Sequence, residues 1–159
     1  MVQSSILFVC LGNICRSPLG EGVLRHLLDA TGNAQGVRVA SAGLGPWHVG
    51  DPPDSRAIAV ARGNGVDISG QRGRQLSAKD FESFDHLLAM DRPVLARMRA
   101  LAPAGRQDRI ALFSDFAGGK TEDVPDPYYG GPAEFDAVYR MIYAGCSAIA
   151  AMLAAEPGS

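Results

Sequence analysis

The sequence predicts an α/β fold with a parallel sheet at its centre. Residues 5–11 form a continuous apolar, β-prone run, which is typical of a strand buried on both faces. Further apolar runs at 37–42, 86–90 and 109–113 alternate with segments of helical periodicity. Strands that alternate with crossover helices are typical of parallel sheets, which bind ligands beyond the carboxyl ends of their strands.

The first predicted helix follows the first strand. We expect it to begin at Pro18, with Ser17 as its N-cap, because apolar residues recur on one face from there onward. Charged residues repeat every four positions on another face: Glu21, Arg25 and Asp29. Shorter helical patterns then follow the second and third strands, at 54–62, 78–81 and 93–101.

The last helix is predicted to follow Pro132. Its apolar residues recur about every 3.6 positions on one face: Phe135, Val138, Tyr139, Ile142, Cys146, Ile149 and Leu153. The apolar stretch at 141–155 falls short of the ~20 residues that a membrane span needs, so we interpret it as a buried helix of a soluble protein. Two loops are expected at the carboxyl edge of the sheet, at 10–17 and 114–132.

Length and charge bound the class of protein. The chain has 159 residues, which fits one domain over 1–159, and its net charge of -2 argues against nucleic acid or an anionic membrane as a partner. Three cysteines are too few for a secreted disulfide framework, and their odd number leaves a free thiol. The first residues lack the positive charge of a signal peptide. We therefore expect a cytoplasmic protein.

The loop at 10–17 has the composition of an anion site. Its amide groups and the start of the following helix should converge beyond the carboxyl end of the first strand. These donors, together with the guanidinium of Arg16, would stabilise Cys10 as a thiolate, which is a nucleophile. The planar fork of Arg16 is suited to hold two oxygens of a tetrahedral oxyanion. The loop therefore predicts nucleophilic chemistry on a phosphate-like group.

Other residues of this loop support that interpretation. Gly12 and Asn13 tolerate the left-handed backbone that a loop with inward amides requires. Ser17 is placed either to cap the helix or to donate to the sulfur. The plainer alternative is that Cys10 is a buried apolar residue and Arg16 a solvated charge. The presence of Cys, Gly-Asn, Arg and Ser-Pro in one strand-to-helix turn favours chemistry instead.

At this point the sequence resembles a known family. The run Cys-Leu-Gly-Asn-Ile-Cys-Arg-Ser at 10–17 looks like the signature of the low molecular weight protein tyrosine phosphatases. The resemblance extends to Asp-Pro-Tyr-Tyr-Gly at 126–130, Ser-Ala-Gly at 41–43 and Trp-His-Val-Gly at 47–50. It implies a three-layer fold: a four-stranded parallel sheet with helices on both faces and an N-terminal phosphate-binding loop between strand 1 and helix 1. It also implies a phosphocysteine intermediate and no metal or cofactor.

The resemblance assigns catalytic roles residue by residue. Cys10 is the expected nucleophile, and Asp126 the expected general acid and then general base. The expected phosphate-binding residues are Leu11, Gly12, Asn13, Ile14, Cys15, Arg16 and Ser17. If Asp126 is not the acid, Asp115 and Asp123 are the alternatives. The expected substrates are proteins that carry phosphotyrosine, with inorganic phosphate as the product, and the protein is expected to be a monomer without nucleic-acid or membrane partners.

Supporting roles follow from the same resemblance. Asn13 and Ser41 should hold the loop through hydrogen bonds. Three aromatic residues should form the substrate rim: Trp47, Tyr128 and Tyr129. Independently of the resemblance, Cys15 lies in the same loop as an easily oxidised thiolate, so we expect it to protect Cys10 through a reversible disulfide. Many relatives carry a histidine in the segment 70–73, where this chain has Gln71 as the candidate replacement.

Four alternative functions use the same loop. A redox role is suggested by Cys10 and Cys15 in one loop, although their spacing is not C-x-x-C. Arsenate reduction needs further cysteines, and none lies between Cys15 and Cys146, which we expect to be a packing residue. Relatives that hydrolyse phosphoarginine carry a small polar residue at the position of Ile14. A phosphate-binding module without catalysis would be expected to lack one of the three catalytic residues.

The histidines are the remaining candidates for chemistry. They show no metal-ligand spacing with the cysteines, and we interpret all three as surface or packing residues: His26, His48 and His86. His48, beside Trp47, is the only one of them that warrants a test. No metal site is therefore expected.

Overall fold

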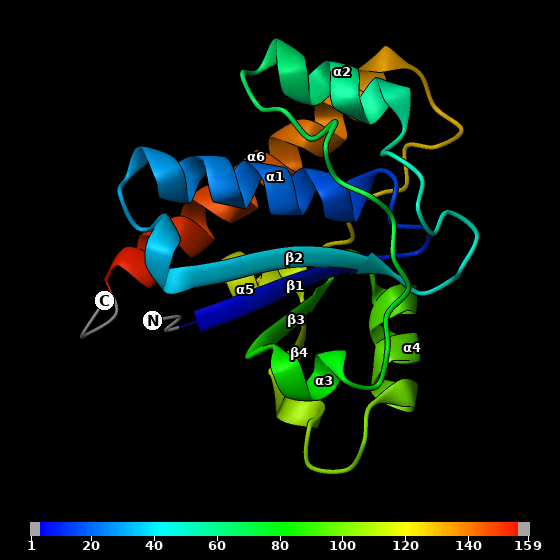
Figure 1. The fold of residues 1–159 in the computed structure, drawn as a ribbon, viewed down its shortest axis with the longest axis vertical. Coiled ribbons are helices and arrows are strands. Elements are labelled where there is room, and N and C mark those ends of the chain that lie inside the picture. Colours follow the sequence, from blue (N-terminus) through cyan, green and yellow to red (C-terminus); the bar gives the residue numbers. More distant parts are fainter. Residues whose placement is uncertain (1–3, 156–159) are drawn as a thin grey trace.

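The computed structural model describes residues 4–155, and its centre is a four-stranded parallel sheet (Figure 1). The strand order is β2-β1-β3-β4. The strands are β1 (Ser4–Cys10), β2 (Val37–Gly43), β3 (His86–Ala89) and β4 (Ile110–Leu112). All seven residues of the inner strand β1 are buried, as its continuous apolar run predicts. The predicted parallel α/β fold is confirmed.

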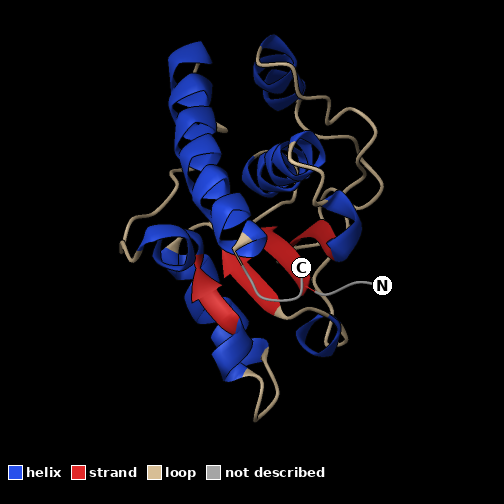
Figure 2. Ribbon diagram, turned by 90° about the vertical axis from the view of Figure 1, so that its left-hand side faces the viewer, coloured by secondary structure: helices blue, strands red, loops and turns tan. Residues whose placement is uncertain are grey.

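Helices cover both faces of the sheet (Figures 1 and 2). One face carries α1 (Arg16–Ala30), α2 (Ser55–Gly63), α5 (Phe113–Gly118) and α6 (Pro132–Ala154). The other face carries α3 (Asp80–Ser83) and α4 (Arg92–Leu101). Two short 3-10 helices, η1 (Ala34–Gly36) and η2 (Gln107–Arg109), precede β2 and β4. The three-layer architecture is therefore the predicted one.

Alternate residues of β1 supply two separate hydrophobic cores. Ile6 and Phe8 face the core under α1 and α6, whereas Leu7 and Val9 face the core under α3 and α4. Phe8 packs against Phe113 with ring centroids 5.9 Å apart. Burial of both faces fixes the register of β1, so the position of its last residue is fixed as well.

Helix α1 begins two residues earlier than predicted. It starts at Arg16 with Cys15 as its N-cap, and no side chain caps its first turn. Ser17 is not the cap because its hydroxyl group lies inside, 3.0 Å from the sulfur of Cys10. Helix α1 approaches β1 closely at Gly20, where a Cβ atom would lie 2.6 Å from the Phe8 ring. The uncapped first turn therefore points its amide groups toward the end of β1.

Helix α6 has the predicted buried face. All seven predicted residues are buried, together with Ala150, and the helix packs against α1, α2 and α5. Pro132 occupies the first turn, and the amide N–H of Gly131 donates to the carboxylate of Glu134 at 2.9 Å. Among residues 4–155 it is the one helix whose length and composition would suit a membrane span, although its apolar face lies against the other helices. The thiol of Cys146 is fully buried, as expected, and burial raises its pKa.

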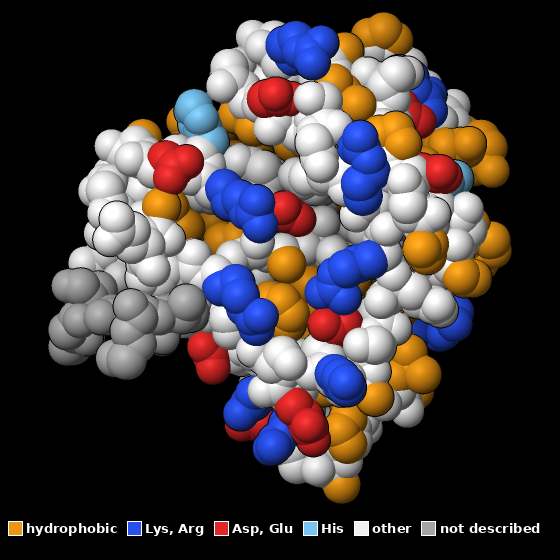
Figure 3. Space-filling model, viewed as in Figure 1, with side chains coloured by type: hydrophobic (Ala, Val, Ile, Leu, Met, Phe, Trp, Pro, Cys, Tyr) orange, Lys and Arg blue, Asp and Glu red, His pale blue; other side chains and the backbone are white. Residues whose placement is uncertain are grey.

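The expected loop at 114–132 is wrong in its first part. Strand β4 ends at Leu112, and α5 occupies the next six residues before Gly119 ends it with φ 71°. The remaining segment, from 119 to 131, has no helix or strand. On the face shown in Figure 3, basic and acidic side chains lie intermixed, as the net charge near zero suggests.

Candidate active site

The loop after β1 forms one wall of an open pocket of about 270 Å³. Cys10 is the last residue of β1, and Arg16 is the first residue of α1, so both are held by regular structure. Asn13 adopts the left-handed backbone that was predicted, with φ 60°, whereas Gly12 does not. The absence of a side chain at Gly12 instead leaves space for the ring of His48, because a Cβ atom there would lie 3.2 Å from Cδ2 of His48.

Hydrogen bonds direct a hydroxyl group at the sulfur of Cys10. The Oγ atom of Ser17 lies 3.0 Å from the Cys10 Sγ atom, and both residues are buried. The side-chain amide of Asn13 donates to Ser17 Oγ at 2.8 Å. Because Ser17 Oγ accepts this bond, its own hydrogen can be donated to the sulfur. The other acceptor within reach, the carbonyl oxygen of Ala42, lies farther away at 3.4 Å. A thiolate at Cys10 would therefore receive a hydrogen bond.

Asn13 itself is fully used in holding the loop. Its amide also donates to Ser41 Oγ at 3.0 Å, and its carbonyl oxygen accepts the backbone N–H of Arg74 at 2.9 Å. These contacts match the supporting positions expected for Asn13 and Ser41. Gln71 makes no hydrogen bond to Asn13, because its side chain donates instead to the carbonyl oxygen of Pro18 at 3.0 Å. The backbone of Arg74 thus supplies the donor that Gln71 does not.

Glu21 extends this hydrogen-bonded chain and was not singled out from the sequence. Ser41 donates to Glu21 Oε1 at 2.8 Å, and Arg25 lies 3.2 Å from Glu21 Oε2. The carboxyl group is only 7% exposed, and burial raises its pKa. Its spacing from Arg25 suggested an exposed helical ion pair, but Glu21 lies one turn after Ser17 and faces inward.

Arg16 is buried among oxygen atoms from two other loops. Its Nη1 atom lies 2.5 Å from Asp91 Oδ2 and donates to the carbonyl oxygen of Val124 at 2.9 Å. Its Nη2 atom lies 3.7 Å from Asp126 Oδ2. Burial alone would lower the pKa of Arg16, but Cys10 and Asp91 outweigh burial and raise it. Arg16 therefore remains a cation at the pocket floor.

Asp126 faces the same pocket from the opposite loop. Its Oδ1 atom accepts the backbone N–H of Tyr128 at 3.1 Å, and its side chain is 44% exposed. The structure therefore brings Asp126 to one pocket with Cys10 and Arg16. The alternative acids do not line this pocket: Asp123 pairs with Arg92 at 3.0 Å, and Asp115 lies in α5.

Three aromatic side chains border the pocket, as expected. Trp47 is 64% exposed and Tyr129 is 96% exposed, whereas Tyr128 is half-buried and meets the Tyr129 ring edge-on at 4.9 Å. His48 also lines the pocket, although we had interpreted it as a surface or packing residue. Its Nδ1 atom lies 3.3 Å from Asp51 Oδ2. Its position next to Trp47 is the reason that the sequence singles it out among the three histidines.

Arg56 joins the two loops that carry the catalytic candidates. It binds both carboxylate oxygens of Asp54, whose backbone N–H donates to the carbonyl oxygen of Ile14 at 2.8 Å. It also donates to the carbonyl oxygen of Gly130 at 3.2 Å, and its guanidinium lies over the Tyr128 ring at 5.5 Å. Asp54 is two residues away in the chain, but Gly130 and Tyr128 are distant, so no sequence pattern indicated this link.

Cys15 lies in the same pocket as a free thiol. Its side chain is 4% exposed. Burial raises its pKa, and the nearby carboxylate of Asp54 adds to the effect. Cys15 is therefore a protonated thiol beside the candidate nucleophile. Among residues 4–155, no three His, Cys, Asp or Glu side chains gather as ligands for a metal ion.

Comparison with known proteins covers nearly the whole chain. The family described as low molecular weight phosphotyrosine protein phosphatase matches residues 5–158. The low molecular weight protein-tyrosine-phosphatase YfkJ of Bacillus subtilis is 37% identical over 153 residues, which is 96% of this chain and 97% of that protein.

Solved structures agree with this sequence match. A protein tyrosine phosphatase from Entamoeba histolytica, crystallised with Hepes in its active site, has a TM-score of 0.89 and 33% identity, covering 95% of this chain and 97% of that chain. Wzb of Vibrio vulnificus in complex with benzylphosphonate has a TM-score of 0.82 and 35% identity, covering 94% of this chain and 99% of that chain. The chain therefore belongs to the family of low molecular weight phosphotyrosine protein phosphatases, which are hydrolases.

Proposed function

We propose that the protein hydrolyses phosphotyrosine on other proteins through a phosphocysteine intermediate on Cys10. The observation that carries this proposal is a single pocket lined by Cys10, Arg16 and Asp126, with aromatic side chains at its mouth. The complex of Wzb with benzylphosphonate supports it, because that ligand joins an aromatic ring to a tetrahedral phosphonate. An aryl phosphate is thus the substrate class that the pocket suits best.

In the first step, the Cys10 thiolate attacks the phosphorus atom in line with the aryl oxygen. The S–P bond forms, and the P–O bond to the aryl oxygen breaks. Arg16 and the amide groups of residues 11–17 hold the other phosphate oxygens, where they stabilise the transition state. Asp126 gives a proton to the departing oxygen, so the product leaves as a neutral phenol.

In the second step, water hydrolyses the phosphocysteine. Asp126, now a carboxylate, takes a proton from the attacking water, and the S–P bond breaks. The thiolate of Cys10 leaves with its electron pair and regains the hydrogen bond from Ser17. The product is inorganic phosphate, and the enzyme returns to its starting state.

The rim explains the preference for tyrosine. Trp47, Tyr128 and Tyr129 extend outward from the pocket floor, so a flat aryl ring can stack between them while its phosphate reaches Cys10. A phosphoserine side chain is shorter and leaves these rings without a partner. Ile14 lines the pocket with an apolar side chain, which suits an aryl ring better than the guanidinium of phosphoarginine.

The chemistry also suggests where the protein works. A free thiol at Cys10 is needed for attack, and it persists in a reducing compartment, so we propose a cytoplasmic enzyme. All functional side chains come from one chain, and we propose that the monomer is active.

The decisive experiment measures release of phosphate with a metal chelator present. We expect wild-type protein to hydrolyse p-nitrophenyl phosphate and phosphotyrosine peptides faster than matched phosphoserine peptides and phosphoarginine. Cys10→Ser should be inactive. Asp126→Ala should lose about 10²–10⁴-fold in rate, the usual contribution of a general acid. Acid quenching during turnover should trap phosphate on Cys10.

Asp115→Ala is the matched control, because Asp115 is an exposed aspartate outside the pocket. It should retain wild-type activity. Residual turnover in Cys10→Ser would show that another group is the nucleophile. Equal losses in Asp115→Ala and Asp126→Ala would show that Asp126 is not the acid. Faster hydrolysis of phosphoarginine than of phosphotyrosine would reassign the substrate.

A further inference from the structure

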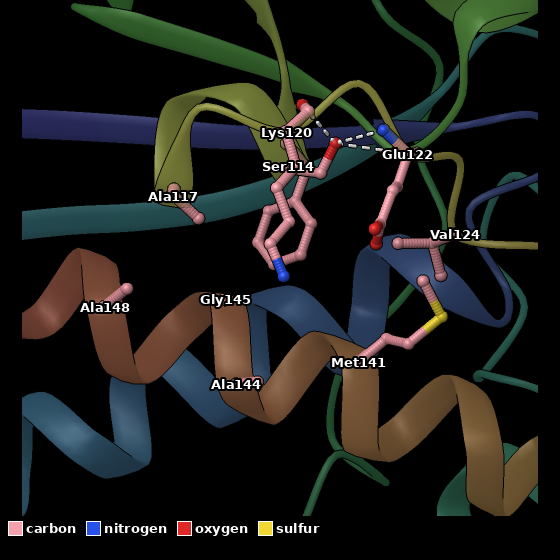
Figure 4. Close-up of a pocket in the computed structure, with 11 residues that line it drawn as sticks. Ser114, Ala117, Lys120, Glu122, Val124, Met141, Ala144, Gly145 and Ala148 are labelled. Atoms are coloured by element: carbon pink, nitrogen blue, oxygen red, sulfur yellow. Dashed lines mark hydrogen bonds between the residues drawn. The ribbon is translucent and has the colours of Figure 1, made fainter.

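A second pocket, of about 330 Å³, lies between α5 and α6 (Figure 4). Its walls include Phe113 and Met141, and small residues of α6 leave space along one side, at Ala144, Gly145 and Ala148. It shares no lining residue with the pocket that contains Cys10. Nothing in the proposed reaction uses this second pocket.

The walls of the pocket are held in place by the fold. Phe113 packs so tightly on α6 that a Cβ atom at Gly145 would lie 2.3 Å from its ring. The hydroxyl group of Ser114 lies 2.9 Å from the carbonyl oxygen of Lys120 and accepts the N–H of Glu122 at 2.9 Å, as Figure 4 shows. The segment that closes the pocket is therefore tied to α5, and the cavity is preformed.

One cation points into this apolar cavity. The side chain of Lys120 extends over α6 toward Gly145 (Figure 4), and among residues 4–155 no carboxylate lies within ion-pair distance of its amine. Glu122 lies toward Val124 and Met141, so the negative charge of the pocket is at that end. Both Lys120 and Glu122 are exposed residues at the rim of the pocket. An anionic group is thus complementary to the Lys120 end alone.

We propose that this pocket binds a small amphipathic anion, with its apolar body between α5 and α6 and its charged head on Lys120, and that binding strengthens the affinity of the Cys10 pocket for phosphate. Val124 provides the connection. Its side chain lines the second pocket, and its carbonyl oxygen accepts the hydrogen bond from Arg16 at 2.9 Å. A ligand packed on Val124 stabilises the arrangement in which Nη1 of Arg16 donates to Val124 and Asp91, and this arrangement leaves Nη2 on the side of Asp126 in the Cys10 pocket.

Binding is tested with two fluorescent probes that differ only in charge. Anilinonaphthalene sulfonate has an apolar body and an anionic head, and N-phenylnaphthylamine is the same body without the head. We expect the anionic probe to bind wild-type protein at least about tenfold more tightly than the neutral probe. Equal affinities would overturn the proposed ligand class. This measurement decides the binding site whether or not the protein is a phosphatase.

Variants locate the bound probe. Lys120→Met should weaken the anionic probe about tenfold, and Ala148→Trp should abolish binding by filling the cavity. The controls are Lys79→Met, at the other lysine of the chain, and Ala151→Trp, at an exposed position of α6 outside the pocket. Both controls should bind like wild type. If Lys120→Met binds as tightly as Lys79→Met, the head does not lie on Lys120 and the proposal fails.

The connection between the pockets is tested by calorimetric titration of inorganic phosphate. Saturating anionic probe should strengthen phosphate binding about threefold, and phosphate should strengthen binding of the probe by the same factor, as linkage requires. This titration rests on the proposed phosphate site, but it measures binding and does not require the protein to be catalytically active. If phosphate affinity fell continuously as the concentration of the anionic probe rose, the two would compete for one site. The sulfonate would then bind in the Cys10 pocket, and the proposal would be overturned. Binding of the probe without any change in phosphate affinity would overturn the regulatory connection.

Discussion

The carboxylate of Asp91 holds the guanidinium of Arg16, with Nη1 and Oδ2 2.5 Å apart. Its other oxygen accepts the backbone N–H of Val94 at 2.9 Å and caps helix α4. The side chains of Arg16 and Asp91 are 3% and 17% exposed, so water screens this ion pair only weakly. One aspartate therefore connects the start of a helix to the arginine proposed to bind phosphate.

Asp91→Asn should impair the reaction with little effect on folding. Asparagine keeps one oxygen that can accept the backbone N–H of Val94 in the helix cap, but it replaces the oxygen facing Arg16 with an NH2 group and removes the negative charge. Hydrogen bonds to charged groups contribute about 1.5–3 kcal/mol, so we expect kcat/KM to fall about tenfold. Steady-state kinetics would measure the loss, with exposed Asp108→Asn as the control. Equal kinetics in the two variants would show that the pair does not position Arg16.

Ser17→Ala should slow attack by Cys10. The variant removes the hydroxyl group that lies 3.0 Å from the Cys10 sulfur, and the thiolate loses a hydrogen bond. We expect kcat and the rate of alkylation by iodoacetamide to fall together, each about tenfold. Ser69→Ala, at a partly exposed turn outside the pocket, is the control. Alkylation of Ser17→Ala at the wild-type rate would separate Ser17 from the reactivity of Cys10.

The sequence predicted the sheet because its strands are apolar over their whole length. Residues 5–11 read as a buried strand, and β1 is buried throughout. The start of α1 was misplaced because Ser17 looks like an N-cap, whereas its hydroxyl group is used by Cys10 and Asn13. Helix α5 was missed because six residues are too few to show helical periodicity.

The residues of the candidate site also fall into two groups, those that the sequence could indicate and those that it could not. Cys10 and Arg16 lie in one short loop, so the sequence itself indicated them, and the resemblance added Asp126. The partners that hold the site are distant: Glu21 binds Ser41 across 20 positions, and Arg16 binds Asp91 across 75. The spacing of residues in a sequence indicates which side chains are neighbours on one helix or strand. These contacts join different elements, so spacing could not predict them.

Arg56→Met should loosen the acid loop while the fold is kept. Methionine keeps an unbranched side chain of similar length but loses the bonds to Asp54 and Gly130 and the cation over the Tyr128 ring. We expect kcat to fall about fivefold and KM to rise less, because Asp126 spends less time in position to donate a proton. Arg62→Met, on an exposed turn of the same helix, is the control. A change in KM alone would indicate a role in binding the substrate.

Glu21 should make the stability of the protein depend on pH. Burial raises its pKa in the folded state above the ordinary value of 4.5, so the folded state binds this proton more tightly than the unfolded state. Its contribution to stability is therefore full below pH 4.5 and is lost as the pH rises through the raised pKa.

Glu21→Gln removes this titration and keeps an acceptor for Ser41. We expect the free energy of unfolding of wild type, relative to Glu21→Gln, to decrease as the pH rises from 4.5, measured by urea denaturation at a series of pH values. Glu82→Gln, at an exposed helical site, reports the background. If the difference between wild type and Glu21→Gln stayed constant with pH, the buried carboxyl group would not titrate as proposed.

Cys15→Ser should make oxidation of the enzyme irreversible. Peroxide converts the thiolate of Cys10 to a sulfenic acid, which then condenses with the Cys15 thiol to give a disulfide and water. Burial and Asp54 raise the pKa of Cys15, so it reacts after Cys10 rather than before it. We expect wild type to regain activity on reduction, and Cys15→Ser to regain about tenfold less because its sulfenic acid oxidises further. Cys146→Ser, at a fully buried thiol in α6, should recover like wild type, and equal recovery in all three proteins would exclude Cys15 as the protecting residue.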